Sequence, residues 1–196
     1  MHGDALEWSM GCTKMKRPWF GWLTGKGDGG DRRKSVPPAA FEVGERDLDP
    51  LTGALRWDRF MTIFNVEQAQ APGVLLLIDL RTRTEGIDAN EWEENLPWLA
   101  QAIRQSIRSD DLLAHVSDYR FAVLLRGASQ HLAEAISRRI LQSVDDTIFM
   151  TADGVEPLET SIGGASFEGG ARRDVVADAI ANLDQARKSG KQAIIH

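Results

Sequence analysis

The stretch HVSDYRFAVLL, residues 115–125, places four polar side chains at a turn between two apolar segments. Ser117, Asp118, Tyr119 and Arg120 supply a hydroxyl, a carboxylate, a phenol and a guanidinium. A turn that holds a nucleotide or Mg²⁺ needs small residues for close approach, or oxygen ligands for the metal. The phenol is neutral near pH 7, and the guanidinium is a cation. These residue types predict no reaction at the turn.

The elements that must position this turn follow from apolar periodicity. Apolar residues recur at helical spacing in four segments and form short runs in five others, which predict helices and strands respectively. Pro97 interrupts one helical segment, so we expect that helix to bend or begin there. The order of elements predicts an α/β fold, an α+β sandwich with a mixed, mainly antiparallel sheet flanked by helices. The helices are expected over 56–70, 90–108, 131–144 and 174–190, and the strands over 73–80, 111–117, 119–126, 158–167 and 191–195.

Five motifs, in order and at nearly the right spacing, resemble those of the GGDEF family, the diguanylate cyclases, over about residues 45–196. DPLTGALRWDRF is similar to the family's opening D-x-L-T-G-L-x-N-R-x-x-F, and LLLIDL to its metal-binding strand. RSDDLLAHVSDYRFAVLL resembles R-x-x-D-x-x-A-R-x-G-G-D-E-F-x-x-L-L. TSIGGA resembles the T-x-S-x-G-x-A strand, and ARKSGKQ resembles A-K-x-x-G-R-N. The resemblance implies the fold of nucleotide cyclases.

The same resemblance implies that the active site is degenerate. Ser117, Asp118, Tyr119 and Arg120 replace the Gly-Gly-Asp/Glu-Glu turn, and Asp79 alone keeps a metal-binding carboxylate. We expect Asp79 to form an ion pair with the nearby arginine, no metal or other cofactor to bind, and the chain not to be an enzyme. The substrate contacts are also altered, because Arg56, the pair Trp92–Glu93, Arg187 and Lys191 stand at positions that contact the nucleotide in the family.

A second ligand site is implied just before the turn. In many family members an R-x-x-D at this position binds the product, cyclic di-GMP, and Arg108 and Asp111 match it in register, with Arg139 as the second arginine. A guanidinium can bind guanine O6 and N7 or a phosphate, and a carboxylate can accept from the guanine edge. The alternative is structural: Arg108 ends a helix, where cations are favoured, and Asp111 caps a turn.

The first 44 residues are expected to form a flexible basic and aromatic extension, and residues 45–196 the domain. Residues 1–40 carry a net charge of +3, which leaves −9 for the remainder and argues against nucleic acid as a partner. The segment Met15–Leu23 combines basic residues with three aromatics. It is predicted to dock onto a protein partner or a membrane surface, and the alternatives are an unstructured tail or a segment that folds back onto the acidic domain.

Together these features predict an inactive, cytoplasmic, bacterial signalling domain that acts as a cyclic di-GMP receptor. The alternative is a ligand-independent scaffold for protein interactions, and residual cyclase activity is a third hypothesis. Cys12 is the single cysteine, which fits a reducing compartment. No apolar run approaches the roughly 20 residues of a membrane span, although association with a membrane surface and a homodimer both stay open.

Overall fold

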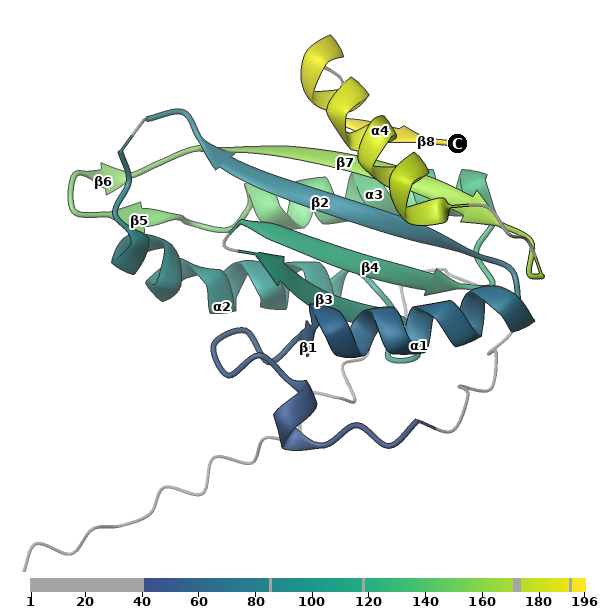
Figure 1. Ribbon diagram of the computed structural model, residues 1–196. Coiled ribbons are helices and arrows are strands. Elements are labelled where there is room, and N and C mark those ends of the chain that lie inside the picture. The colour runs from purple at the N-terminus through teal and green to yellow at the C-terminus, as the bar shows by residue number, and fades with distance from the viewer. Residues whose placement is uncertain (1–40, 85, 118, 171–173, 191) are drawn as a thin grey trace, which may run out of the picture.

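The computed structural model describes residues 41–196, except for residues 85, 118, 171–173 and 191 (Figure 1). The segment Met15–Leu23 and its predicted docking therefore lie outside the described residues, and the division at residue 44 stays a prediction. The elements follow one another as η1 (Glu45–Asp47), β1 (Leu55–Arg56), α1 (Trp57–Gln70), β2 (Gly73–Thr82), α2 (Ala89–Gln105), β3 (Leu112–Ser117), β4 (Arg120–Arg126), α3 (Gln130–Asp145), β5 (Met150–Thr151), β6 (Gly154–Val155), β7 (Leu158–Phe167), α4 (Val175–Ser189) and β8 (Ala193–Ile195).

Six strands form the main sheet in the order β1-β3-β4-β2-β7-β8. The two outer pairs, β1 with β3 and β7 with β8, are parallel, whereas the three inner pairs are antiparallel. A separate hairpin joins β5 to β6. This arrangement confirms the predicted fold class of a mixed, mainly antiparallel sheet with flanking helices.

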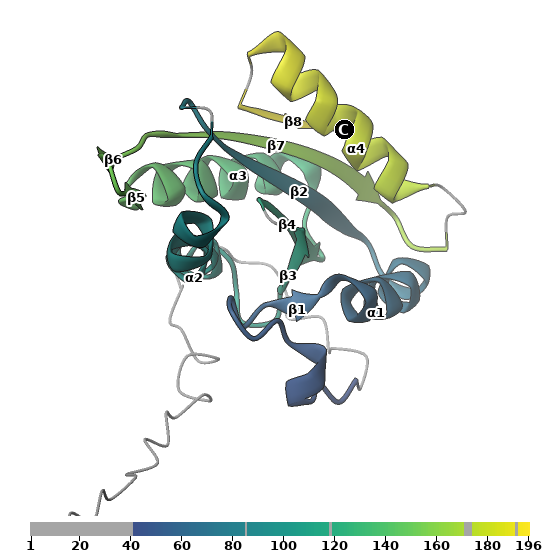
Figure 2. The same cartoon turned by 60° about the vertical axis from the view of Figure 1, so that its left-hand side comes forward.

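Side chains of β2 alternate between the two faces of the sheet, because successive residues of a strand point to opposite sides. Val74, Leu76 and Ile78 belong to the core beneath α2 and α3, whereas Leu75 and Leu77 belong to the core beneath α1 and α4. Figures 1 and 2 show these two helical layers on opposite faces of the sheet. Asp79 continues the second series, so its side chain lies on the α1 and α4 face.

Short polar caps explain where three of the helices begin. Asp88, Ser129 and Asp174 each accept a hydrogen bond from a backbone N–H in the first turn of α2, α3 and α4. The helix expected over 90–108 is confirmed at its start, because the cap at Asp88 starts α2 at Ala89. The helix continues through Pro97, so the alternative that it begins there is wrong. No helix among the described residues is long and apolar enough to span a bilayer.

Candidate functional site

Asp79 lies towards the end of the central strand β2, and its side chain is only 8% exposed. Its Cα partner across the β2–β4 ladder is Arg120, the first residue of β4. Asp79 Oδ1 accepts hydrogen bonds from Arg120 Nε at 3.2 Å and Nη2 at 3.0 Å. The predicted ion pair between Asp79 and Arg120 is therefore confirmed.

Two further arginines reach the other oxygen of Asp79. Arg81 Nε lies 3.0 Å from Asp79 Oδ2, and Arg187 Nε, from α4, lies 3.8 Å from the same atom. One carboxylate thus faces three guanidinium groups, and the local charge is positive. No cluster of three or more His, Cys, Asp or Glu side chains suited to a metal ion occurs within the described residues. A divalent cation at Asp79 would have to displace these arginines and would meet their repulsion.

Tyr119 points to the opposite face of the sheet from Arg120. Its ring packs on Trp92 with a centroid distance of 4.1 Å, and Trp92 in turn lies 4.6 Å from Phe149. Trp92 is buried and belongs to the core, although the resemblance places it at a position expected to contact the nucleotide. The Tyr119 carbonyl accepts from the Leu80 N–H at 2.9 Å. The Tyr119 ring therefore packs the β3–β4 hairpin against α2.

The other residues at the turn and at positions expected to contact the nucleotide lie at the surface or outside the described residues. Arg56 is exposed, and its Nε donates to the Leu48 carbonyl at 3.2 Å. Glu93 is exposed on α2. Ser117 ends β3 and pairs with Arg120 after an irregularity in the ladder. Asp118 and Lys191 lie outside the described residues, so their predicted roles are untested.

The opening motif DPLTG forms a turn that contacts the β3–β4 hairpin. Asp49 Oδ1 accepts from the Thr52 N–H at 2.8 Å and from Thr52 Oγ1 at 2.7 Å, and it lies 3.4 Å from His115 Nδ1 on β3. Partial burial by itself would raise the pKa of Asp49, but the Thr52 hydrogen bonds and the neighbouring His115 outweigh it and lower that pKa overall. The motif thus has a local structural function that does not depend on catalysis.

Asp111 is 1% exposed at the start of β3, and both of its carboxylate oxygens bind backbone. Oδ2 accepts from the Arg108 N–H at 3.1 Å, and Oδ1 accepts from the Arg126 N–H at 3.1 Å. Burial lowers the pKa of Arg104 to about 10 while the charge of Asp111 opposes that change, and Arg104 Nη1 donates to the Asp111 carbonyl. Asp111 therefore fixes the turn that carries Arg108, as the structural alternative expects. The other part of that alternative is wrong, because α2 ends at Gln105 and Arg108 lies beyond it.

Arg139 reaches the same turn from α3. Its guanidinium donates to the Ser106 carbonyl at the C-terminus of α2, two residues before Arg108. The structure thus brings together Arg108, Asp111 and Arg139, which we call the Arg108 corner. Their contacts within the protein are structural, and whether they also bind a ligand stays a prediction.

Sequence reasoning missed the buried pair of Arg126 and Glu67 behind this corner. Arg126 Nη2 lies 2.6 Å from Glu67 Oε1, and Arg126 Nη1 donates to the Asp110 carbonyl at 2.6 Å. The available signal was Glu67 on the apolar side of α1. Arg81 was also missed, because the strand was expected to end at residue 80. The observed β2 continues to Thr82, which places Arg81 and Asp79 on the same face.

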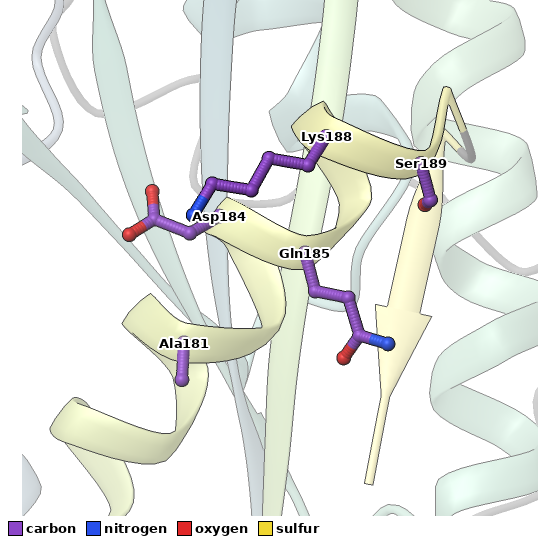
Figure 3. A pocket seen from close by; sticks show the side chains of 5 residues that line it. All are labelled: Ala181, Asp184, Gln185, Lys188 and Ser189. Carbon is purple, nitrogen blue, oxygen red and sulfur yellow. The ribbon is translucent and has the colours of Figure 1, made fainter.

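A shallow hollow on the outer surface of α4 carries no site. Its lining comes entirely from that helix: Ala181, Asp184, Gln185, Lys188 and Ser189 (Figure 3). Asp184 and Lys188 extend together along one side, whereas Gln185 extends along the other. All five residues are exposed, and no second element encloses a ligand.

Comparison with known proteins gives one family. The family model described as "Diguanylate cyclase, GGDEF domain" matches residues 48–193. A search of curated proteins gave no significant match.

Solved structures share the fold at low sequence identity. The diguanylate cyclase SiaD of Pseudomonas aeruginosa, solved with its activator SiaC, is 20% identical with a TM-score of 0.64, over 76% of this chain and 61% of that chain. The FimX GGDEF domain from the same organism is 23% identical with a TM-score of 0.64, over 76% and 99%. The GGDEF domain of DgcB from Caulobacter crescentus, in complex with c-di-GMP, is 14% identical with a TM-score of 0.64, over 79% and 98%. The chain therefore spans less than two thirds of the SiaD chain.

Proposed function

Because the chain belongs to the diguanylate cyclase GGDEF family over residues 48–193, we propose that it is a non-catalytic member that serves as a cyclic di-GMP receptor. The observation that carries the proposal is the set of three arginines on Asp79. Phosphoryl transfer requires metal ions that neutralise developing charge and a fixed in-line geometry. Arg81, Arg120 and Arg187 occupy the surroundings of the carboxylate that would hold such ions.

The proposed ligand site is the Arg108 corner. Guanidinium groups suit both the guanine edge and the phosphates of a cyclic dinucleotide. Arg108 is the main contact in this proposal, and Arg139 is the second. Asp111 positions Arg108, because a direct contact between its buried carboxylate and guanine would compete with two backbone amides. The DgcB structure, which contains c-di-GMP, supports the ligand class at the level of the family.

The second candidate function is a scaffold for protein interaction that needs no ligand. The engagement of Asp111 and Arg139 with backbone groups favours it, since these contacts explain both residues without a nucleotide. The SiaD structure includes a protein activator, so a GGDEF protein can contact another protein. The binding experiment below separates the two candidates.

We expect purified protein with GTP and Mg²⁺ to form no cyclic di-GMP. The physical reason is that the cations on Asp79 and the packed ring of Tyr119 leave no place for two metal ions. Product is measured by chromatography, with SiaD as the positive control. The same Mg²⁺ concentration should leave the melting temperature unchanged, because a ligand stabilises a protein only by binding the folded state. More than one product molecule per chain would contradict the assignment.

Calorimetric titration with cyclic di-GMP should give a dissociation constant of micromolar or lower, about −8 kcal/mol or stronger. Arg108→Ala should weaken binding at least about tenfold, which corresponds to 1.4 kcal/mol, because it leaves polar ligand groups unpaired. Arg139→Ala should also weaken it. The matched control is Arg138→Ala, since Arg138 is the exposed neighbour of Arg139 on α3, and it should bind normally.

Melting curves of each variant test whether loss of folding causes the weaker binding. Unchanged affinity in Arg108→Ala would reject the site. An absence of binding by the wild-type chain would reject the receptor function and favour the scaffold.

A further inference from the structure

Four large apolar side chains are exposed on α2 and on the segment that contains the β5–β6 hairpin. They are Trp98, Ile148, Met150 and Val155, with exposed fractions of 62%, 64%, 52% and 67%. Single exposed apolar residues are normal on a protein surface, whereas a group of them indicates an interaction site. We call these four residues the apolar patch. It belongs to α2 and the β5–β6 hairpin, which lie beside each other in Figures 1 and 2.

Hydrogen bonds hold the segments of the patch together. The side chain of Asn95 on α2 donates to the Met150 carbonyl at 2.8 Å and accepts from the Met150 N–H at 3.0 Å. Trp98 lies one helical turn after Asn95, on the neighbouring side of α2. Met150 and Val155 are Cα partners in the hairpin, so their side chains share a face.

The hairpin residues expose their apolar side chains for a local reason. Phe149 is buried against Trp92, and the residues before and after it in an extended chain point the other way. Ile148 and Met150 therefore face solvent on the same side. Glu91 Oε1 accepts from the Ala152 N–H at 2.6 Å, which ties the hairpin turn to α2 as well. The patch is thus a fixed surface.

The two segments that carry the patch are acidic in sequence. Its two segments, residues 89–98 and 145–156, contain seven acidic residues and no lysine or arginine. Five of these acidic side chains are exposed: Glu93, Glu94, Asp145, Asp146 and Asp153. An apolar centre with an acidic rim fits a short peptide that combines aromatic and basic side chains.

We infer that the occupant is the segment Met15–Leu23 of the same chain. That segment supplies Trp19, Phe20 and Trp22 for the apolar centre, and Lys16 and Arg17 for the acidic rim. The two parts of the chain also carry opposite net charges, +3 for residues 1–40 and −9 for the remainder, so they attract each other.

The length of the connecting chain permits this contact. Residues 24–40 separate the segment from the described domain. They span at most about 60 Å when fully extended, and a Gly-rich chain of that length has a mean end-to-end distance of about 20–25 Å. A domain of about 150 residues has a radius of gyration of about 15 Å, so the segment can reach the patch. Tethering gives an effective concentration on the order of millimolar, so a weak contact suffices.

The test uses the single cysteine of the full chain. Cys12 lies three residues before Met15, so a nitroxide attached there reports on the segment by broadening nearby amide signals in NMR spectra. We expect broadening of the amides of residues 148–156 and of α2 near Trp98. Trp98→Glu should abolish it, as should the triple change Trp19→Ser, Phe20→Ser and Trp22→Ser. The matched control is Ile180→Glu, which changes another exposed apolar residue, on α4, and should preserve the broadening.

Three outcomes would overturn the inference. The first is broadening that avoids the patch or survives Trp98→Glu. The second is broadening in a mixture of isotope-labelled chains with separately spin-labelled chains, which would identify a second copy as the occupant. The third is an unbroadened patch in a chain that sediments with anionic vesicles through Trp19, Phe20 and Trp22, which would assign the segment to a membrane surface.

Discussion

Arg126→Met is expected to lower the free energy of unfolding by about 3–5 kcal/mol, because it leaves the Glu67 carboxylate buried without its partner. Both side chains are only 6% exposed, and the pair is joined at 2.6 Å. The Asp110 carbonyl also loses the hydrogen bond from Arg126 Nη1. Denaturant unfolding of the wild type and the variant measures the difference.

Two controls identify burial of charge as the cause. Arg83→Met removes an exposed pair with Glu159, whose side chains are 67% and 59% exposed, and should cost less than about 1 kcal/mol. The double change Glu67→Met with Arg126→Met removes both buried charges and should recover much of the stability. A double variant as unstable as the sum of the two single variants would show that the two residues do not interact.

The same pair affects the proposed ligand site. Arg126 contacts Asp110 through its side chain and Asp111 through its backbone N–H. Asp111 in turn holds the N–H of Arg108. Arg126→Met should therefore weaken cyclic di-GMP binding, although residue 126 does not contact the ligand in this proposal. The losses of stability and of binding should appear together in this variant.

Much of the fold follows from sequence because its elements carry local signals. The apolar run before Asp79 and the helical spacing from Trp57 onwards predict β2 and α1 within a few residues. The β5–β6 hairpin was missed because each strand has two residues and no apolar alternation. Pro97 left open whether α2 begins there, and the capping box at Asp88 and Glu91 determines that the helix begins at Ala89.

The candidate site divides in the same way. The pairing of Asp79 with Arg120 was predictable, because the family resemblance places the two residues close together. The contact from Arg187 depends on how α4 packs across the sheet. The position of a helix on a sheet cannot be predicted from the spacing of residues in the sequence. Asp111 is the opposite case: its sequence register predicts a ligand contact, whereas its burial and two backbone hydrogen bonds give it a structural function.

Gly163→Ala is expected to destabilise the domain by about 3 kcal/mol, at the upper end of the usual range for overpacking. An added Cβ would lie 2.1 Å from Leu183 N, 2.4 Å from Leu183 Cα and 2.5 Å from the Ala179 carbonyl oxygen. All three are backbone atoms of α4, so relief requires the whole helix to move away from β7. The midpoint of denaturant unfolding measures the effect.

The adjacent Gly164 provides the matched control for this prediction. An added Cβ there would meet only side-chain atoms, with Leu76 Cδ2 at 2.7 Å and Ile195 Cγ1 at 3.0 Å. Side chains can change rotamer, so Gly164→Ala should cost about 1 kcal/mol. Equal losses for the two variants would contradict the rigid contact of α4 with the sheet. Because that contact sets the position of Arg187 against Asp79, the close approach at Gly163 also helps to keep Arg187 beside that carboxylate.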